Sequence, residues 1–285
     1  MYPMGALGAN RTVRDAIVAG IFYPDDAAGL IDAVDDALCA ALGPDSRNEP
    51  TRPIAIVSPH AAFEYACDVQ AAAWASAARG PVDRVVIVAP LRRRGESAAY
   101  LPESDAFRTP LGDIEVDTGA CADLESCNTL FSCNDIPHLE SHAIEVQLPF
   151  MRRLFPEALL VPILVADDSI LASGVARAID LVLGDDFDRT LLVASANLAS
   201  SIVAADAARR SDDALAMMQA LAWRDLAERS DIAGATAVSS VMAVGSMRGA
   251  RYRLIKRIDS LRHGSPAAER IVNYAAVSWY PGAGS

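Results

Sequence analysis

The sequence predicts an α/β protein in which a mixed, mostly parallel central sheet lies between two layers of helices. Short continuous apolar runs, typical of strands buried on both faces, recur along the chain. Ala-rich or amphipathic segments of helical length separate these runs. Apolar residues make up 52% of the 285 residues, enough to bury a large core. We expect one domain over residues 1–285, with residues 1–13 as a loose lead-in.

The apolar runs and the helical segments alternate in a regular order. The predicted strands cover residues 54–58, 84–89, 114–117, 159–165, 190–194, 252–258 and 271–280. The predicted helices cover residues 27–42, 64–79, 170–183, 204–228 and 234–248. Asp25 or Asp26 can cap the first helix. The strand–helix–strand order predicts right-handed parallel crossovers, so we expect ligands beyond the carboxyl ends of the strands.

The charge and the cysteines exclude several classes of partner. The formal net charge is −12, and the longest basic run, Arg92-Arg93-Arg94, is too short for a phosphate-backbone stripe. We therefore expect no nucleic acid and no membrane as partners, and no apolar run has bilayer-spanning length or the form of a secretory signal. The five cysteines show no CxxC pair, which favours a reducing, cytoplasmic location. A homo-oligomer is compatible with the sequence.

The stretch from His138 to Phe150 is the richest in chemistry. Read as a helix, it places His138, His142 and Glu145 on one face, as a metal site or an acid–base pair requires. The alternative is a polar face that hydrogen-bonds nearby backbone. Pro149 predicts a kink or a helix end, because it lacks the amide that would bond back to Glu145.

Five stretches, in order along the chain, carry a resemblance to one family. They are Arg14 with Val18–Pro24, Pro59–Tyr65, Thr109–Gly112 with Val116-Asp117, His138–Phe150, and Tyr274–Ala276. Together they resemble the Memo-like proteins, relatives of the class III extradiol dioxygenases. The stretch from His138 to Phe150 is the most specific of the five. The resemblance implies an extradiol dioxygenase-like fold, with a site at the carboxyl ends of the central strands.

The resemblance also implies a set of site residues, most of which this chain replaces. The dioxygenase relatives hold non-haem Fe(II) on two histidines and a carboxylate. Memo-like proteins have two histidines and a cysteine, beside an aspartate and a further histidine. In this chain the first histidine is His60, and Arg92 falls at the second. Asn197 and Ser200 fall at the aspartate and the further histidine, and Val238 falls at the cysteine.

These replacements predict a degraded metal site. An arginine at the second ligand position puts a permanent positive charge where a metal cation would sit, so we expect no metal and no cofactor. A site for non-haem iron or copper stays open as an alternative. Its ligands would be His60 and His142 with one of Glu64, Glu140 and Glu145.

We expect a pocket that is lined by His60, Arg92, His142, Glu145, Asn197, Ser200 and Val238. The predicted function is a non-oxygenase binding or scaffold protein for a small anionic or peptide ligand. One alternative is an enzyme with His60 as acid or base and Arg92 as anion anchor, and another is a metal-dependent extradiol-type dioxygenase. His142 and Glu145 could equally be buried polar groups that hold the pocket together. Cys67 is either a reactive thiol or inert packing.

Overall fold

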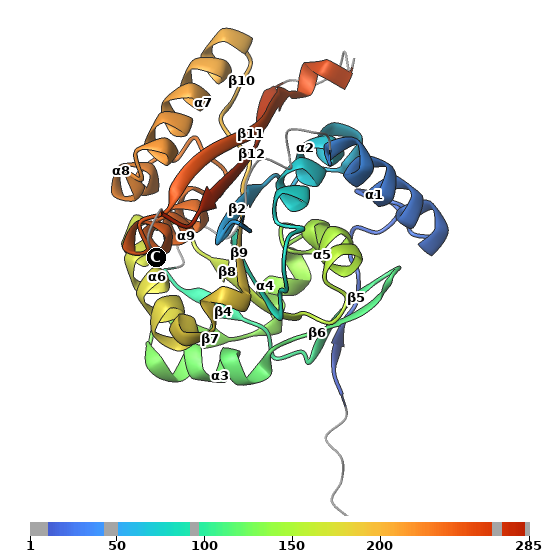
Figure 1. Cartoon of the computed structure of the whole chain (residues 1–285), viewed down its shortest axis with the longest axis vertical. Coiled ribbons are helices and arrows are strands. Elements are labelled where there is room, and N and C mark those ends of the chain that lie inside the picture. The colour runs from blue at the N-terminus through green and yellow to red at the C-terminus, as the bar shows by residue number, and fades with distance from the viewer. Residues whose placement is uncertain (1–10, 43–50, 92–96, 264–269, 283–285) are drawn as a thin grey trace, which may run out of the picture.

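The computed structural model describes residues 11–42, 51–91, 97–263 and 270–282. Over these ranges the chain is a mixed α/β protein whose large sheet carries helices on both faces, which confirms the predicted fold class (Figure 1). The strand order in that sheet is β10-β12-β2-β9-β3-β8-β4-β7, and β11 pairs with β12.

Four parallel strands form the centre of the sheet. They are β2 (Ala55–Ser58), β9 (Thr190–Ser195), β3 (Arg84–Pro90) and β8 (Leu159–Val165). Every residue of β2 and β9 is buried, which explains their continuous runs of Ala, Val, Ile and Leu. β2 and β3 run parallel, as predicted, but β9 lies between them.

Antiparallel strands extend the sheet on both sides. Next to β2 lies β12 (Ile271–Tyr280), which also pairs with β11 (Arg251–Asp259) and β10 (Ser200–Ser201). Next to β8 lies β4 (Ala99–Leu101), which runs antiparallel to β8 and parallel to β7 (Phe131–Cys133). The sheet is therefore mixed, with a parallel centre.

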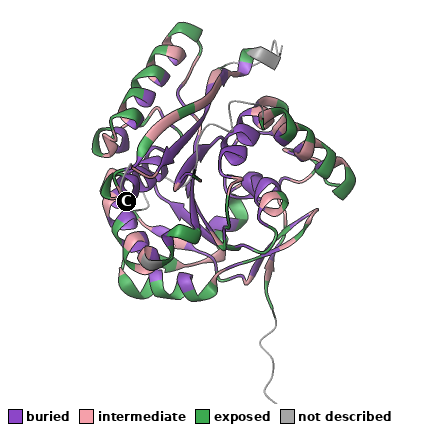
Figure 2. Ribbon diagram, in the orientation of Figure 1, coloured by how far each residue is buried: buried purple, intermediate pink, exposed green. Residues whose placement is uncertain are grey.

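Two helical layers cover the sheet (Figure 1). The first contains α1 (Ala27–Ala41), α2 (Phe63–Ser76) and α5 (Leu148–Leu154). The second contains α3 (Thr118–Cys127), α6 (Ser169–Leu183), α7 (Ala204–Gln219), α8 (Trp223–Ala227) and α9 (Ala235–Met247). Buried residues concentrate on the strands and on the inner faces of the helices (Figure 2). None of the helices described is long and apolar enough to cross a membrane.

Local capping rules hold at the start of α1. Asp26 adopts an extended conformation, and its side chain accepts a hydrogen bond from the Gly29 amide at 2.8 Å. Of the two candidate N-caps that the sequence offers, Asp25 and Asp26, the structure uses Asp26.

The segment that connects β4 to α3 forms a hairpin on a small second sheet. β5 (Ala106–Thr109) and β6 (Gly112–Glu115) are antiparallel, and β1 (Val13–Arg14) pairs with β5. The turn predicted at residues 109–112 is confirmed, with Gly112 at a φ of 105°. The strand predicted at 114–117 is shifted, because β6 ends at Glu115 and only a single bridge joins the next residue to β8.

The helix predicted through His138 and His142 is wrong. α4 (Asp135–Glu140) ends at Ser141, whose backbone is extended, and a 3-10 turn at Glu145–Gln147 precedes α5. Pro149 lies in the first turn of α5, where its missing amide costs no hydrogen bond, so it helps to begin a helix rather than to end one.

A glycine at the start of α9 allows a test of how closely α9 packs against β9. Gly234 has a φ of 101°, and a Cβ atom there would lie 2.9 Å from the Ser195 carbonyl oxygen of β9. Gly234→Ala should lower the free energy of unfolding by about 3 kcal/mol, through backbone strain and the clash. Urea denaturation measures this loss.

The matched control is Gly80→Ala. Gly80 also has a positive φ, 74°, but nothing within 4 Å would meet its Cβ atom. In Gly80→Ala the free energy of unfolding should fall only through backbone strain, by about 1 kcal/mol. Equal losses in the two variants would show that the approach of α9 to β9 is not tight.

Candidate functional site

Two predicted residues meet at the carboxyl ends of β2 and β9. His60 follows β2 and Asn197 follows β9, and these neighbouring parallel strands end side by side at Ser58 and Ser195. The Asn197 side-chain oxygen accepts a hydrogen bond from the His60 backbone amide at 3.0 Å. His60 is only 1% exposed, so the protein itself surrounds this histidine.

His142 lies against His60. Their ring centroids are 5.9 Å apart with the planes at 70°, an edge-to-face contact. On its other side, His142 contacts Phe22, with ring centroids 4.6 Å apart. Phe22 is absent from the predicted site, although it belongs to the opening stretch that carries the family resemblance. His60 and His142 therefore come together, His60 from the segment after β2 and His142 from the segment between α4 and α5.

Gln147 fixes that loop onto the strand ends. Its side-chain amide donates to the Pro59 carbonyl at 2.8 Å and to Ser195 Oγ at 3.1 Å, and its oxygen accepts from Trp74 Nε1 at 3.0 Å. Ser195 Oγ donates in turn to the Ala143 carbonyl at 2.6 Å. Gln147 is also absent from the predicted site, and its only signal is its place in the most family-specific stretch.

Glu145 is fully buried and acts as an acceptor for four donors. Arg14 Nη1 donates to its carboxylate at 2.6 Å, and the Tyr23 hydroxyl donates at 2.7 Å. The backbone amides of Ile17 and Val18 donate at 3.0 and 2.9 Å. Burial, then the Glu145 charge, raises the pKa of Tyr23, so the phenol stays protonated as a donor. Glu145 therefore has a structural role.

Arg14 extends the same network into the loop. Its side chain is 1% exposed, its Nε donates to the His138 carbonyl at 2.8 Å, and its Nη2 donates to the Ser141 carbonyl at 3.0 Å. These bonds satisfy carbonyl groups at the end of α4 that have no partner within the helix. The partner of Glu145 is thus Arg14, an N-terminal residue.

His138 belongs to this structural region and not to the candidate site. Its Nε2 lies 3.2 Å from the Tyr100 carbonyl oxygen, and its ring meets Phe107 edge to face. Burial, and secondarily the Arg14 charge, lower the pKa of His138 to about 3. The imidazole is therefore neutral at physiological pH.

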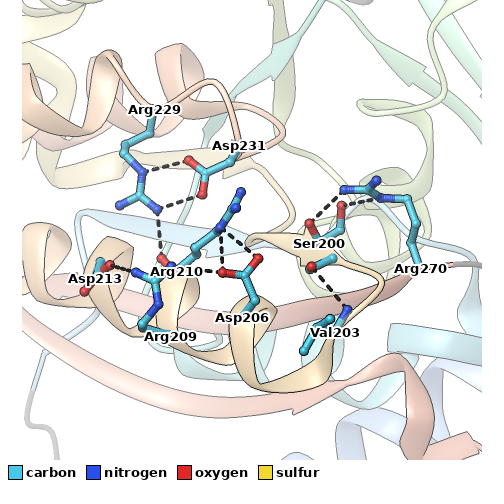
Figure 3. Close-up of polar contacts among 10 residues, drawn as sticks. Ser200, Val203, Asp206, Arg209, Arg210, Asp213, Arg229, Asp231 and Arg270 are labelled. Atoms are coloured by element: carbon cyan, nitrogen blue, oxygen red, sulfur yellow. Dashed lines mark hydrogen bonds and ion pairs between the residues drawn. The ribbon is translucent and has the colours of Figure 1, made fainter.

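Ser200 lies on β10, at one edge of the sheet, where it accepts hydrogen bonds from Arg270. Its Oγ accepts from Arg270 Nε at 3.3 Å, and its carbonyl accepts from Arg270 Nη2 at 2.9 Å. Figure 3 shows Ser200 turned toward Arg270, next to the ion pairs that Asp206 makes with Arg209 and Arg210 on α7. The described contacts of Ser200 are therefore with the start of β12.

Val238 lies fully buried in the hydrophobic core on α9. The residue of this region that touches the site is Ala233, whose carbonyl accepts from the Asn197 backbone amide at 3.0 Å. Gly234 follows Ala233 and has a φ of 101°. Neither the Val238 nor the Ala233 side chain carries an atom that could bind a metal.

Arg92 lies outside the described residues, which stop at Leu91 on this side of the gap. Glu64 and Glu140 are exposed, at the start of α2 and at the end of α4. Within the described ranges, no three His, Cys, Asp or Glu side chains are grouped so that they could hold a metal ion. The donor set there does not fit non-haem iron or copper.

Cys67 on α2 is a packing residue. Burial, and then the charge of Asp68, raise the pKa of its thiol to about 12, so the reactive thiolate is not populated near neutral pH. All five cysteines are free.

Comparison with known proteins identifies the family. The family model described as "Memo-like protein" matches residues 14–277. The chain belongs to the Memo-like family. A MEMO1 family protein of Methanopyrus kandleri is 28% identical over 283 residues, which cover 93% of this chain and 98% of that protein. MEMO1 family proteins of Methanobrevibacter smithii and Thermotoga neapolitana are 29% and 32% identical, over 65% of this chain and 69% and 70% of theirs.

The contribution of the buried ion pair between Arg14 and Glu145 to the stability of this Memo-like protein can be tested with Glu145→Gln. The substitution keeps the shape of the side chain but leaves Arg14 buried without its counter-charge. The free energy of unfolding should fall by about 3–5 kcal/mol. Urea denaturation at neutral pH measures it.

The control for Glu145→Gln is Asp35→Asn. Asp35 makes a two-bond ion pair with Arg153, and both side chains are about 40% exposed. Because water screens this pair, its loss should cost about 1 kcal/mol or less. A similar small loss for Glu145→Gln would show that the buried pair does not hold the loop.

His138 should make stability depend on pH. Below about pH 6.5 the unfolded chain binds a proton on His138, whereas the folded protein binds it only below about pH 3. The free energy of unfolding should therefore fall as the pH is lowered through this window, by at most about 1.4 kcal/mol per pH unit from this residue. His138→Gln should have the shallower slope in urea denaturation between pH 6 and pH 4. If the unchanged protein and His138→Gln had equal slopes, the pKa of His138 would be the same in the folded and unfolded chains. The side chain would then be in contact with water.

Proposed function

We propose that this Memo-like protein is a binding protein and not an oxygenase, with a site around His60 and His142 that takes a small anionic or peptide ligand. The observation that supports this most is the state of Glu145. It is the buried carboxylate of the stretch from His138 to Phe150, yet Arg14, Tyr23 and two backbone amides use its acceptor capacity.

The remaining polar groups supply no replacement ligand. A catalytic metal centre on this kind of site normally takes three protein donors. Asn197 is a neutral amide whose oxygen accepts from the His60 backbone, and Ala233 has no donor atom. Two histidines without a carboxylate do not complete the two-histidine, one-carboxylate set of non-haem Fe(II) oxygenases, and this argues against extradiol chemistry.

The chemistry of the ligand follows from the sequence next to β3. Arg92, Arg93 and Arg94 come directly after Leu91, in the longest run of consecutive basic residues in this acidic chain. Arginine forks suit carboxylate and phosphate groups, so an anion or the carboxylate end of a peptide is the proposed ligand. The contact between His60 and His142 favours an alternative in which His60 moves a proton on that ligand.

Metal analysis tests the proposal. Purified protein is incubated with Fe(II) or Cu(II) and desalted, and its metal content is measured by mass spectrometry. We expect no more than about 0.1 metal ions per chain, no change in melting temperature with a chelator, and no oxygen uptake with catechol. A full equivalent of iron or copper that is lost in His60→Gln would refute the proposal.

A second arm measures ligand binding with trialanine as the probe. Its carboxylate should bind saturably, and Arg92→Gln should weaken the binding about tenfold. Arg209→Gln on α7 is the matched control, since it removes the same charge from an exposed position. Equal effects of the two variants would show that only the overall charge matters. Hydrolysis of trialanine that His60→Gln abolishes would favour the enzyme alternative.

A further inference from the structure

A cavity of about 850 Å³ opens at the amino ends of the central strands. His60 lies at the other end of these strands, after the carboxyl end of β2. The residues around the cavity precede β2 and β9, lie between α2 and β3, lie at the end of α9, or follow β12. None of them belongs to the candidate site described above. Its volume lies within the range of small-molecule sites.

The lining of this cavity is cationic. It includes three guanidinium groups, from Arg52, Arg79 and Arg248, and one carboxylate, from Asp188. The whole chain carries a net charge of −12, so a local excess of positive charge runs against its general character. Such a concave positive region attracts anions from solution.

Arg52 is held by backbone groups. Its Nη1 donates to the carbonyl groups of Pro53 and Thr190, and its Nη2 donates to the carbonyl of Asp188 at 3.0 Å. Carbonyl oxygens fix the position of a guanidinium group but bring no net negative charge. Burial lowers the pKa of Arg52, against the opposing charge of Asp188. An anion in the cavity would stabilise this partly desolvated cation.

Arg248 is held by an aromatic ring. Its guanidinium carbon lies 3.6 Å from the centre of the Phe187 ring, and its Nη2 donates to Asp180 at 2.7 Å. Its Nε is buried and has no hydrogen-bond partner within the described part of the chain. Stacking fixes the plane of the group, and a fixed planar fork suits carboxylate and phosphate oxygens.

Much of the remaining lining is apolar. It includes Ile54, Pro81, Pro281 and the side chain of Met247, which is half exposed on the last turn of α9. Methionine side chains adapt to the shape of flat apolar groups. A ligand that matches both parts of the lining has an anionic group and an apolar body.

We propose that this cavity is a second binding site, which takes a small organic carboxylate or phosphate ester with a flat apolar group. The anionic group lies among Arg52, Arg79 and Arg248, and the flat group lies against Ile54 and Met247. The site is independent of the function proposed above, because it uses other residues at the opposite edge of the sheet.

The test uses phenyl phosphate and benzoate as probes in calorimetric titrations of the full chain. At least one of them should bind saturably below about 10 mM, and at least about tenfold more tightly than inorganic phosphate, because only they fill the apolar part. Binding of phenyl phosphate alone identifies phosphate esters, and binding of benzoate alone identifies carboxylates. Benzylamine, a cation of the same shape, should not bind.

Two kinds of variant place the binding in the cavity. Arg79→Gln and Arg248→Gln should each weaken it about tenfold or more, whereas Arg209→Gln should change it by less than about twofold. In NMR spectra of protein with labelled methionine methyl groups, the signal of Met247 should shift when the probe is added. The variant Met247→Leu identifies this signal. Absence of saturable binding of both probes, equal weakening by Arg209→Gln, or an unmoved Met247 signal would each overturn the proposal.

Discussion

The ion pair between Arg14 and Glu145 is the interaction on which the candidate site depends. It joins the N-terminal segment to the loop that carries His142 and Gln147. Removing both charges from water is costly, and here the remaining hydrogen-bonding capacity is satisfied by backbone amides, carbonyl groups and the Tyr23 hydroxyl. An ion pair whose hydrogen bonds are all made holds the loop in one arrangement. Any other arrangement of the loop would leave Arg14 or Glu145 buried without its partners.

The residues that mark the family are therefore mostly architectural. Glu145 and Gln147 hold the loop on the strand ends, and their contacts explain why the most family-specific stretch has this composition. Beside His60 lie neutral groups, the Asn197 amide and the backbone of Ala233. Membership of the Memo-like family does not by itself establish the chemistry of the site, since a fold can be retained while its site changes.

Features that depend on nearby residues could be predicted from the sequence, and those that depend on distant contacts could not. The buried strands and the Asp26 cap follow from local pattern. The same pattern predicts a helix that continues from His138 to His142, but α4 stops at Glu140, where Arg14 binds the carbonyl groups of His138 and Ser141. Likewise, the contact of Ala233 with Asn197 could not be predicted, because it depends on the close approach of Gly234 to Ser195 on another strand. The short strands β4, β5 and β7 lack a long enough apolar run.

The position of β9 between β2 and β3 has a consequence for synthesis on the ribosome. The first two central strands emerge long before Thr190–Ser195, yet neither can complete its hydrogen bonding without that strand. Pairings so distant in sequence slow folding, because a large loop must close first. The nascent N-terminal half therefore leaves the exit tunnel with unpaired apolar edges, and chaperones that shield such edges have their longest opportunity in this interval.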